Sequence, residues 1–186
     1  MKRSRLALFA LVLSLGSGTT PDYLSARRKL DLIEQDKLRP GTRVVLSQRE
    51  LNAWVQTDIA QMAPQGVRDM RLELGQGSAS GSALIDFLKV RQAQGKAPGW
   101  LAAKLLAGER PVRVTTRIQS GGGRATVDVE RVEVSGILVE GRLLEFLIQN
   151  YLTPNYPDAK IGKPFELGHR IDRLELAPAS VGVFIR

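Results

Sequence analysis

The stretch VVLSQRELNAWV, residues 44–55, contains the strongest local structural pattern in this chain of 186 residues. Residues 43–46 predict a short strand. Ser47 and Glu50 then follow the capping-box pattern, in which the serine hydroxyl and the glutamate carboxylate each accept a hydrogen bond from the other residue's amide. The helix that begins here has apolar residues at i, i+3, i+4, i+8 and i+11, which form one continuous stripe of Leu51, Trp54, Val55, Ile59 and Met62.

A second amphipathic helix is predicted over residues 141–152 (GRLLEFLIQNYL), and Pro154 and Pro157 end it. Its wide apolar stripe consists of Leu143, Leu144, Leu147, Ile148, Tyr151 and Leu152. Two further helices are predicted, one over residues 23–38 and a short one over residues 98–107, which has Pro98 at its start and Gly108 at its end.

Most of the remaining chain predicts antiparallel strands, which cover residues 70–74, 79–92, 110–119, 124–135, 170–176 and 180–185. Both faces of the strand over 79–92 are apolar, and we expect Asp86 within it to occupy an edge or a bend with its carboxylate in solvent. In the strand over 124–135 the apolar side changes at Glu130-Arg131, which predicts a bulge or a strong bend.

The order of these elements favours an α+β fold, because hairpins dominate and no alternation of strand and helix is sustained. We expect a long bent antiparallel sheet wrapped around one or two amphipathic helices. Residues 43–186 would form this single domain, and residues 19–42 would be a helical lead-in, either a linker or a terminal helix lying on the fold.

The N-terminus has the pattern of a secretory signal. Lys2, Arg3 and Arg5 precede an apolar run over residues 6–16, and small residues follow it. Residues 1–18 are therefore expected to be a signal peptide with cleavage near Thr19, or an uncleaved anchor. Either alternative places the folded part in the periplasm or elsewhere outside the cytoplasm.

Charge and composition exclude several function classes. The 27 Lys and Arg residues exceed the 19 Asp and Glu residues, giving a formal net charge of +8. Removal of the signal leaves 24 basic residues and a net charge of +5, with the basic residues mostly interleaved with acids. Aromatic residues make up only 5% of the chain, so we expect no nucleic-acid binding and favour transient contact with an anionic membrane surface.

Catalytic and metal-binding residues are scarce. The chain has no Cys, and His169 is its only His, which excludes thiolate sites and multi-histidine clusters. His169 has Glu166 and Asp172 nearby in the sequence, but Gly168-His169-Arg170 is typical of a surface turn. No nucleophile-elbow motif occurs. We therefore predict no catalytic residues, no metal site and no cofactor.

The apolar stripes suggest two alternatives. They pack against one another as an ordinary core, or they leave a groove between sheet and helices that holds an acyl chain. The residues proposed for such a groove are Leu51, Trp54, Val55, Ile59, Phe87, Leu88, Leu143, Leu147, Ile148 and Tyr151, with Phe87 and Leu88 contributed by the sheet.

The secretion signal, the opening VVLSQRELNAWV and the long hairpins that follow resemble exported bacterial lipid-binding proteins of the TULIP (tubular lipid-binding) type. The late helix over 141–152, the KPFEL segment at 163–167 and the closing strands over 170–185 also resemble that pattern. The resemblance covers about residues 43–185 and implies a curled sheet around a long helix, an apolar groove for lipid tails, and no catalysis. The chain departs from the pattern in being short and in its insertion at 98–107.

The sequence thus predicts an exported protein that carries or senses an envelope lipid, with a phospholipid or another acyl lipid as its ligand. The alternative is a structural or adaptor module of the envelope with a fully packed core, which would have no cavity of about 300 Å³ or more. A hydrolase would require a cleft that joins His169 to a serine and an acid.

Overall fold

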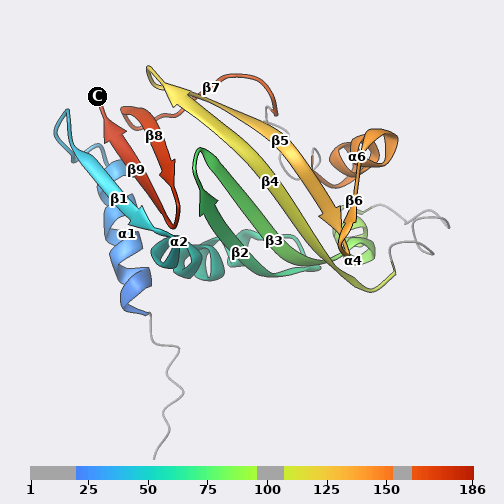
Figure 1. Cartoon of the computed structure of the whole chain (residues 1–186). Coiled ribbons are helices and arrows are strands. Elements are labelled where there is room, and N and C mark those ends of the chain that lie inside the picture. Colours follow the sequence, from blue (N-terminus) through green and yellow to red (C-terminus); the bar gives the residue numbers. More distant parts are fainter. Residues whose placement is uncertain (1–19, 96–106, 153–160) are drawn as a thin grey trace, which may run out of the picture.

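The computed structural model describes residues 20–95, 107–152 and 161–186 and has an α+β fold (Figure 1). The predicted signal over 1–18 and nearly all of the predicted short helix over 98–107 lie outside the described residues. Among the helices of the described part, none has the length and apolar character needed to cross a membrane.

Two antiparallel sheets form the framework. The larger has the order β2-β3-β4-β5-β6, with β7 paired to β5. Its strands are β2 (Val67–Gly75), β3 (Ser78–Asp86), β4 (Glu109–Gly121), β5 (Arg124–Val134), β6 (Ile137–Leu138) and β7 (Phe165–Glu166). The smaller has the order β1-β9-β8, formed by β1 (Arg43–Ser47), β8 (Ile171–Ala177) and β9 (Ser180–Ile185). The predicted α+β class and the long antiparallel sheet that wraps around helices are confirmed.

The helices gather at the two ends of the long hairpins. Figure 1 shows the small sheet with α1 (Pro21–Glu34) and α2 (Gln48–Trp54) at one end, and α4 (Phe87–Ala93) and α6 (Gly141–Leu147) at the other. The buried residues accordingly form two clusters. One cluster joins α1, α2 and the small sheet, and the other joins α4, α6 and the far half of the large sheet.

Helix α1 packs on the fold. Its N-cap Thr20 accepts a hydrogen bond from the amide of Tyr23, and Ala26 and Ile33 are buried in the first cluster. The helix ends at Glu34, before the predicted end at residue 38, and Asp36 just beyond it has a positive φ of 52°.

The capping box at the start of α2 is confirmed, since Ser47 and Glu50 make both reciprocal hydrogen bonds. Beyond Trp54 the helix continues through a π-helical turn, η1 (Val55–Ile59), into α3 (Ala60–Met62). Met62 is predicted to lie on the apolar stripe, but it is 71% exposed because the last turn of the helix extends past the core.

The long strand predicted over 79–92 is wrong in its second half. β3 ends at Asp86, and the chain turns directly into α4. The carboxylate of Asp86 accepts hydrogen bonds from the amides of Leu88 and Lys89, each at 3.1 Å, and so caps the helix. Asp86 is therefore buried rather than in solvent, and Phe87 and Leu88 belong to a helix rather than to the sheet.

The bulge predicted at Glu130-Arg131 is confirmed. Thr115 of β4 pairs with Arg131 of β5, whereas the next residue, Thr116, pairs with Val129, so that Glu130 is the additional residue. This single insertion changes which side chains of β5 face the helices.

The second amphipathic helix is also present, as α6 followed by a second π-helical turn, η2 (Ile148–Leu152). It packs over the same half of the large sheet as α4, and Leu147 is buried in the second cluster.

Candidate functional site

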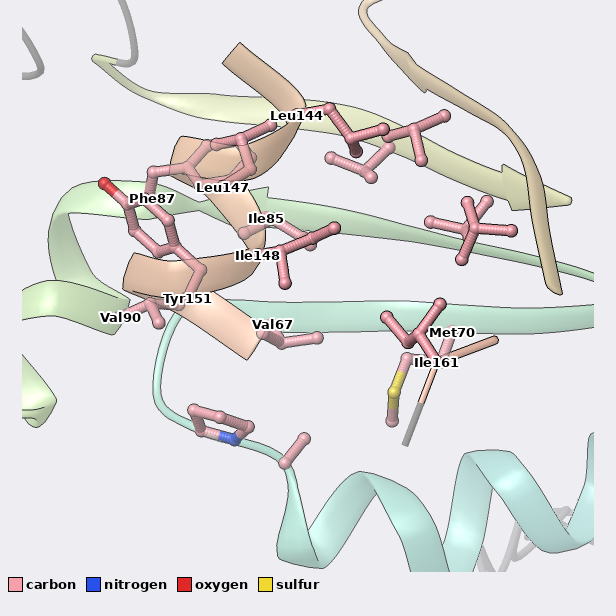
Figure 2. Close-up of a pocket in the computed structure, with 16 residues that line it drawn as sticks. Val67, Met70, Ile85, Phe87, Val90, Leu144, Leu147, Ile148, Tyr151 and Ile161 are labelled. Atoms are coloured by element: carbon pink, nitrogen blue, oxygen red, sulfur yellow. The ribbon is translucent and has the colours of Figure 1, made fainter. Parts of the chain in front are cut away.

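An apolar pocket of about 290 Å³ lies between the large sheet and the helices α4 and α6 (Figure 2). Among the described residues that line it, none has a charged side chain and Tyr151 carries the only hydroxyl. The lining consists of Ala63, Pro64, Val67, Met70, Ile85, Phe87, Val90, Val112, Val114, Val129, Val132, Leu144, Leu147, Ile148, Tyr151 and Ile161.

The sheet contributes its side of the lining through strand periodicity and the bulge. Val112 and Val114 lie two residues apart on β4 and therefore share a face. Val129 and Val132 lie three residues apart on β5, which would place them on opposite faces of a regular strand. Because Glu130 is inserted between them, both face the pocket.

The helices contribute the other side. Phe87 and Val90 share a face of α4, and the stripe of the second helix supplies Leu144, Leu147, Ile148 and Tyr151. The rings of Phe87 and Tyr151 meet edge to face, with centroids 5.0 Å apart and planes at 83°. This contact joins α4 to η2 at one end of the pocket.

Of the ten residues proposed for a groove, the structure brings four together around this pocket: Phe87, Leu147, Ile148 and Tyr151. Leu51 and Trp54 belong to the other cluster, on the far side of the fold. Val55 and Ile59 lie on η1 and do not line the pocket, and neither does Leu88 on α4. Leu143 is 51% exposed on the outer face of α6.

All of the lining contributed by the sheet is absent from the residues predicted for the groove. The shared parity of Val112 and Val114, together with the parity change on either side of Glu130, is the sequence signal that could have identified these positions. Leu144 belongs to the predicted helix stripe but not to the predicted groove. Val90 is absent from the predicted groove, although the same predicted strand supplied Phe87 and Leu88.

Two polar residues, Arg91 and Asn150, lie near Tyr151 at one end of the pocket. The guanidinium of Arg91 lies 6.0 Å from the centre of the Tyr151 ring and donates a hydrogen bond of 2.9 Å to Asn150 Oδ1. Asn150 Nδ2 in turn donates to the carbonyl of Phe146 at 2.8 Å, which fixes the orientation of the amide. Burial raises the pKa of Tyr151, and the positive charge of Arg91 acts in the opposite direction.

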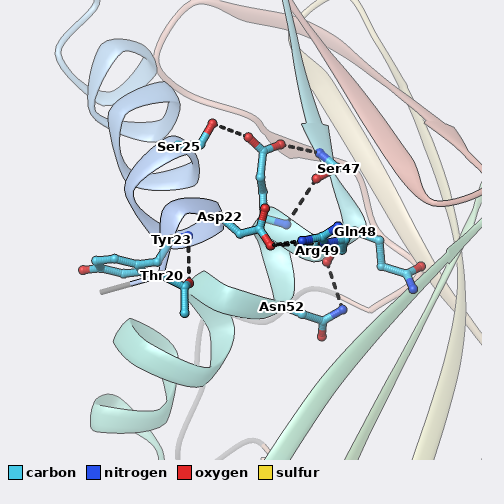
Figure 3. Close-up of polar contacts among 9 residues, drawn as sticks. Thr20, Asp22, Tyr23, Ser25, Ser47, Gln48, Arg49 and Asn52 are labelled. Atoms are coloured by element: carbon cyan, nitrogen blue, oxygen red, sulfur yellow. Dashed lines mark hydrogen bonds and ion pairs between the residues drawn. The ribbon is translucent and has the colours of Figure 1, made fainter. Parts of the chain in front are cut away.

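Glu50 of α2 is a second buried acid, besides Asp86, and its hydrogen-bond partners Ser25 and Lys29 lie on α1. Figure 3 shows Ser25 on α1 facing Ser47 at the start of α2. Its carboxylate accepts hydrogen bonds from Lys29 Nζ at 2.6 Å, from the Ser47 amide at 2.7 Å and from the Ser25 hydroxyl. Burial acts to raise its pKa, but these donors outweigh burial and lower the pKa from 4.5 to about 2. Because these partners lie on α1 and at the start of α2, Glu50 joins the two helices.

The stability that Glu50 provides is expected to depend on pH. A carboxyl whose pKa is lowered by folding contributes fully above about pH 4.5, and the contribution disappears as the pH falls toward about 2. The free energies of unfolding of the wild type and of Glu50→Gln, measured in urea, should therefore differ at pH 7 and become similar near pH 2. A difference in unfolding free energy that is constant over this range would contradict the ionised state assigned to Glu50.

The remaining candidates for chemistry are dispersed. His169 is exposed in the turn before β8 with a positive φ of 41°, as the sequence predicts. Within residues 20–95, 107–152 and 161–186, no group of three or more His, Asp or Glu side chains is arranged to hold a metal ion.

Comparison with protein-family models gives no match, and comparison with curated proteins gives none either.

Proposed function

We propose that this protein binds an acyl lipid and acts as an exported lipid-binding or lipid-carrier protein of the cell envelope. The observation that carries the proposal is the apolar pocket between the large sheet, α4 and α6. Each methylene group moved from water into such a site contributes about 0.8 kcal/mol, and the described lining offers an aliphatic chain no buried charge to desolvate.

The presence of an apolar pocket supports the proposal over a fully packed module. Its volume of about 290 Å³ lies just below the range of about 300–1,000 Å³ typical of small-molecule sites. An adaptor module with no binding cavity would be expected to fill this space with larger side chains than the four valines of β4 and β5.

One observation favours the adaptor function as a second candidate. Ile137, Leu138, Leu143 and Phe146 are 39–70% exposed on β6 and α6, and grouped exposed apolar side chains are typical of surfaces that bind a partner. The same surface would also suit contact with a membrane from which a lipid is taken.

Mass spectrometry of the protein extracted from its native membranes tests the proposal. We expect a stoichiometric acyl lipid to co-purify and to be lost from a pocket-filled variant. Protein that is folded, carries no lipid and fails to take up a fluorescent fatty acid would contradict the proposed function and favour the adaptor.

A further inference from the structure

The guanidinium of Arg91 lies beside Tyr151, which lines one end of the pocket together with Val90, although Arg91 does not itself line the pocket. Figure 2 shows these two residues next to each other, at the opposite end from Met70 and Ile161. Arg91 follows Val90 directly on α4, and its guanidinium faces the Tyr151 ring at 6.0 Å. A cation therefore flanks one end of a pocket whose described lining has no charge.

The described residues around Arg91 hold its guanidinium in place without neutralising its charge. Asn150 Oδ1 accepts a hydrogen bond from one of the five N–H groups of the guanidinium. The Asn150 amide is itself oriented by the hydrogen bond that it donates to the Phe146 carbonyl. In the described part of the chain, no carboxylate forms an ion pair with Arg91. Asp86, the acid at the start of the same helix, is engaged by the α4 amides and lies 3.5 Å from Lys89 Nζ.

We propose that the ligand is a single-chain amphiphile with an anionic head, whose chain fills the pocket and whose head accepts hydrogen bonds from Arg91. This inference rests on the proposed lipid-binding function and deepens it. The guanidinium presents paired donors that match a carboxylate or a phosphate, and such charge-assisted hydrogen bonds are stronger than neutral ones.

The volume of the pocket supports one chain rather than two. At about 290 Å³ the pocket is already at the lower limit for small-molecule sites, and the two chains of a diacyl phospholipid would need about twice the space of one. Arg91 is thus a positioning and recognition residue, and the apolar lining supplies the affinity for the chain.

The test measures binding of dodecanoate, dodecyl phosphate and dodecan-1-ol, which share a chain and differ in the head. We expect the wild type to bind at least one anionic probe about tenfold or more tightly than the alcohol. Arg91→Met should abolish this preference and leave the affinity for the alcohol unchanged, which also shows that the variant is folded. Arg91→Lys should retain part of the preference.

Arg142→Met is the matched control, because Arg142 is an exposed cation on α6 and its loss changes the net charge equally. Unlike Arg91, Arg142 is not among the described cations that face the Tyr151 ring. It should keep the full preference for the anion. Whichever of the two anionic probes binds more tightly identifies the head of the ligand as a carboxylate or a phosphate.

Equal binding of all three probes by the wild type, or a preference that survives in Arg91→Met, would overturn the assignment of the anionic head while leaving the lipid-binding function in place. Failure of every probe to bind, the alcohol included, would instead overturn the proposed function itself.

Discussion

Val114→Phe is expected to lower the affinity for an acyl chain about a hundredfold. Val114 lies on β4 with its side chain in the pocket, and phenylalanine adds four carbons at that position. The added ring would displace about four methylene groups of the ligand, each worth about 0.8 kcal/mol, for a total of about 3 kcal/mol. Titration with a fluorescent fatty acid measures the loss directly.

Thr115→Phe provides the control for this variant. Thr115 is the next residue on β4, so its side chain faces the opposite side of the sheet, where it meets the Ser80 hydroxyl at 2.9 Å. The same ring added there should leave fatty-acid affinity close to that of the wild type. Equal affinities of the two variants would show that the acyl chain does not occupy the pocket.

Glu50→Ala is expected to destabilise the protein by about 3 kcal/mol. The change removes one side of the capping box, worth about 1 kcal/mol, and leaves Lys29, Ser25 and the Ser47 amide without their charged acceptor. The two helices α1 and α2 would then lose the polar contact that joins them beside the first core cluster. Urea unfolding at pH 7 gives the change in free energy.

Glu109→Ala tests whether burial of the carboxylate is the reason that Glu50→Ala destabilises the protein. Glu109 also forms an ion pair, with Arg68 at 2.6 Å, but both side chains are well exposed. Solvent screens such a pair, so its loss should have little effect on stability. If Glu109→Ala and Glu50→Ala were equally destabilising, the special role given to the buried carboxylate would be contradicted.

Local patterns predicted much of the fold. The capping box at Ser47 and Glu50 uses only hydrogen bonds between near neighbours, so its formation depends little on the rest of the chain. The bulge at Glu130 could be predicted because side chains alternate strictly along a regular strand, so that a change of apolar parity requires an inserted residue or a bend. The turn at His169 could be predicted because Gly168 precedes it and glycine is common in turns.

The junction at which β3 ends and α4 begins could not be predicted from local patterns. The apolar residues around Asp86 are compatible with a strand or a buried helix, and the choice depends on a tertiary contact. Gly66, with a φ of +97°, approaches this junction so closely that a Cβ there would lie 2.8 Å from the Asp86 carbonyl oxygen. Its own carbonyl accepts a hydrogen bond from the Asp86 amide at 2.7 Å, which fixes where β3 ends.

Only part of the pocket lining could be predicted, because it too depends on tertiary contacts. Periodicity identifies which side chains of a helix are buried, but it does not identify the partner they are buried against. The stripe that contains Leu51 and Trp54 faces α1 and the small sheet, whereas the stripe that contains Leu147 and Tyr151 faces the pocket. The division of the strands into two sheets, which separates these two environments, has no local signature.

Nuclear magnetic resonance of the protein with bound dodecanoate tests the central claim most directly, through contacts between ligand methylene protons and protein methyl groups. We expect contacts from the chain to Val114, Leu147 and Ile148, and from the carboxylate end to the region of Arg91 and Tyr151. Contacts confined to the exposed side chains of Ile137 and Leu143, with none inside the pocket, would contradict binding of the acyl chain between the sheet and the helices.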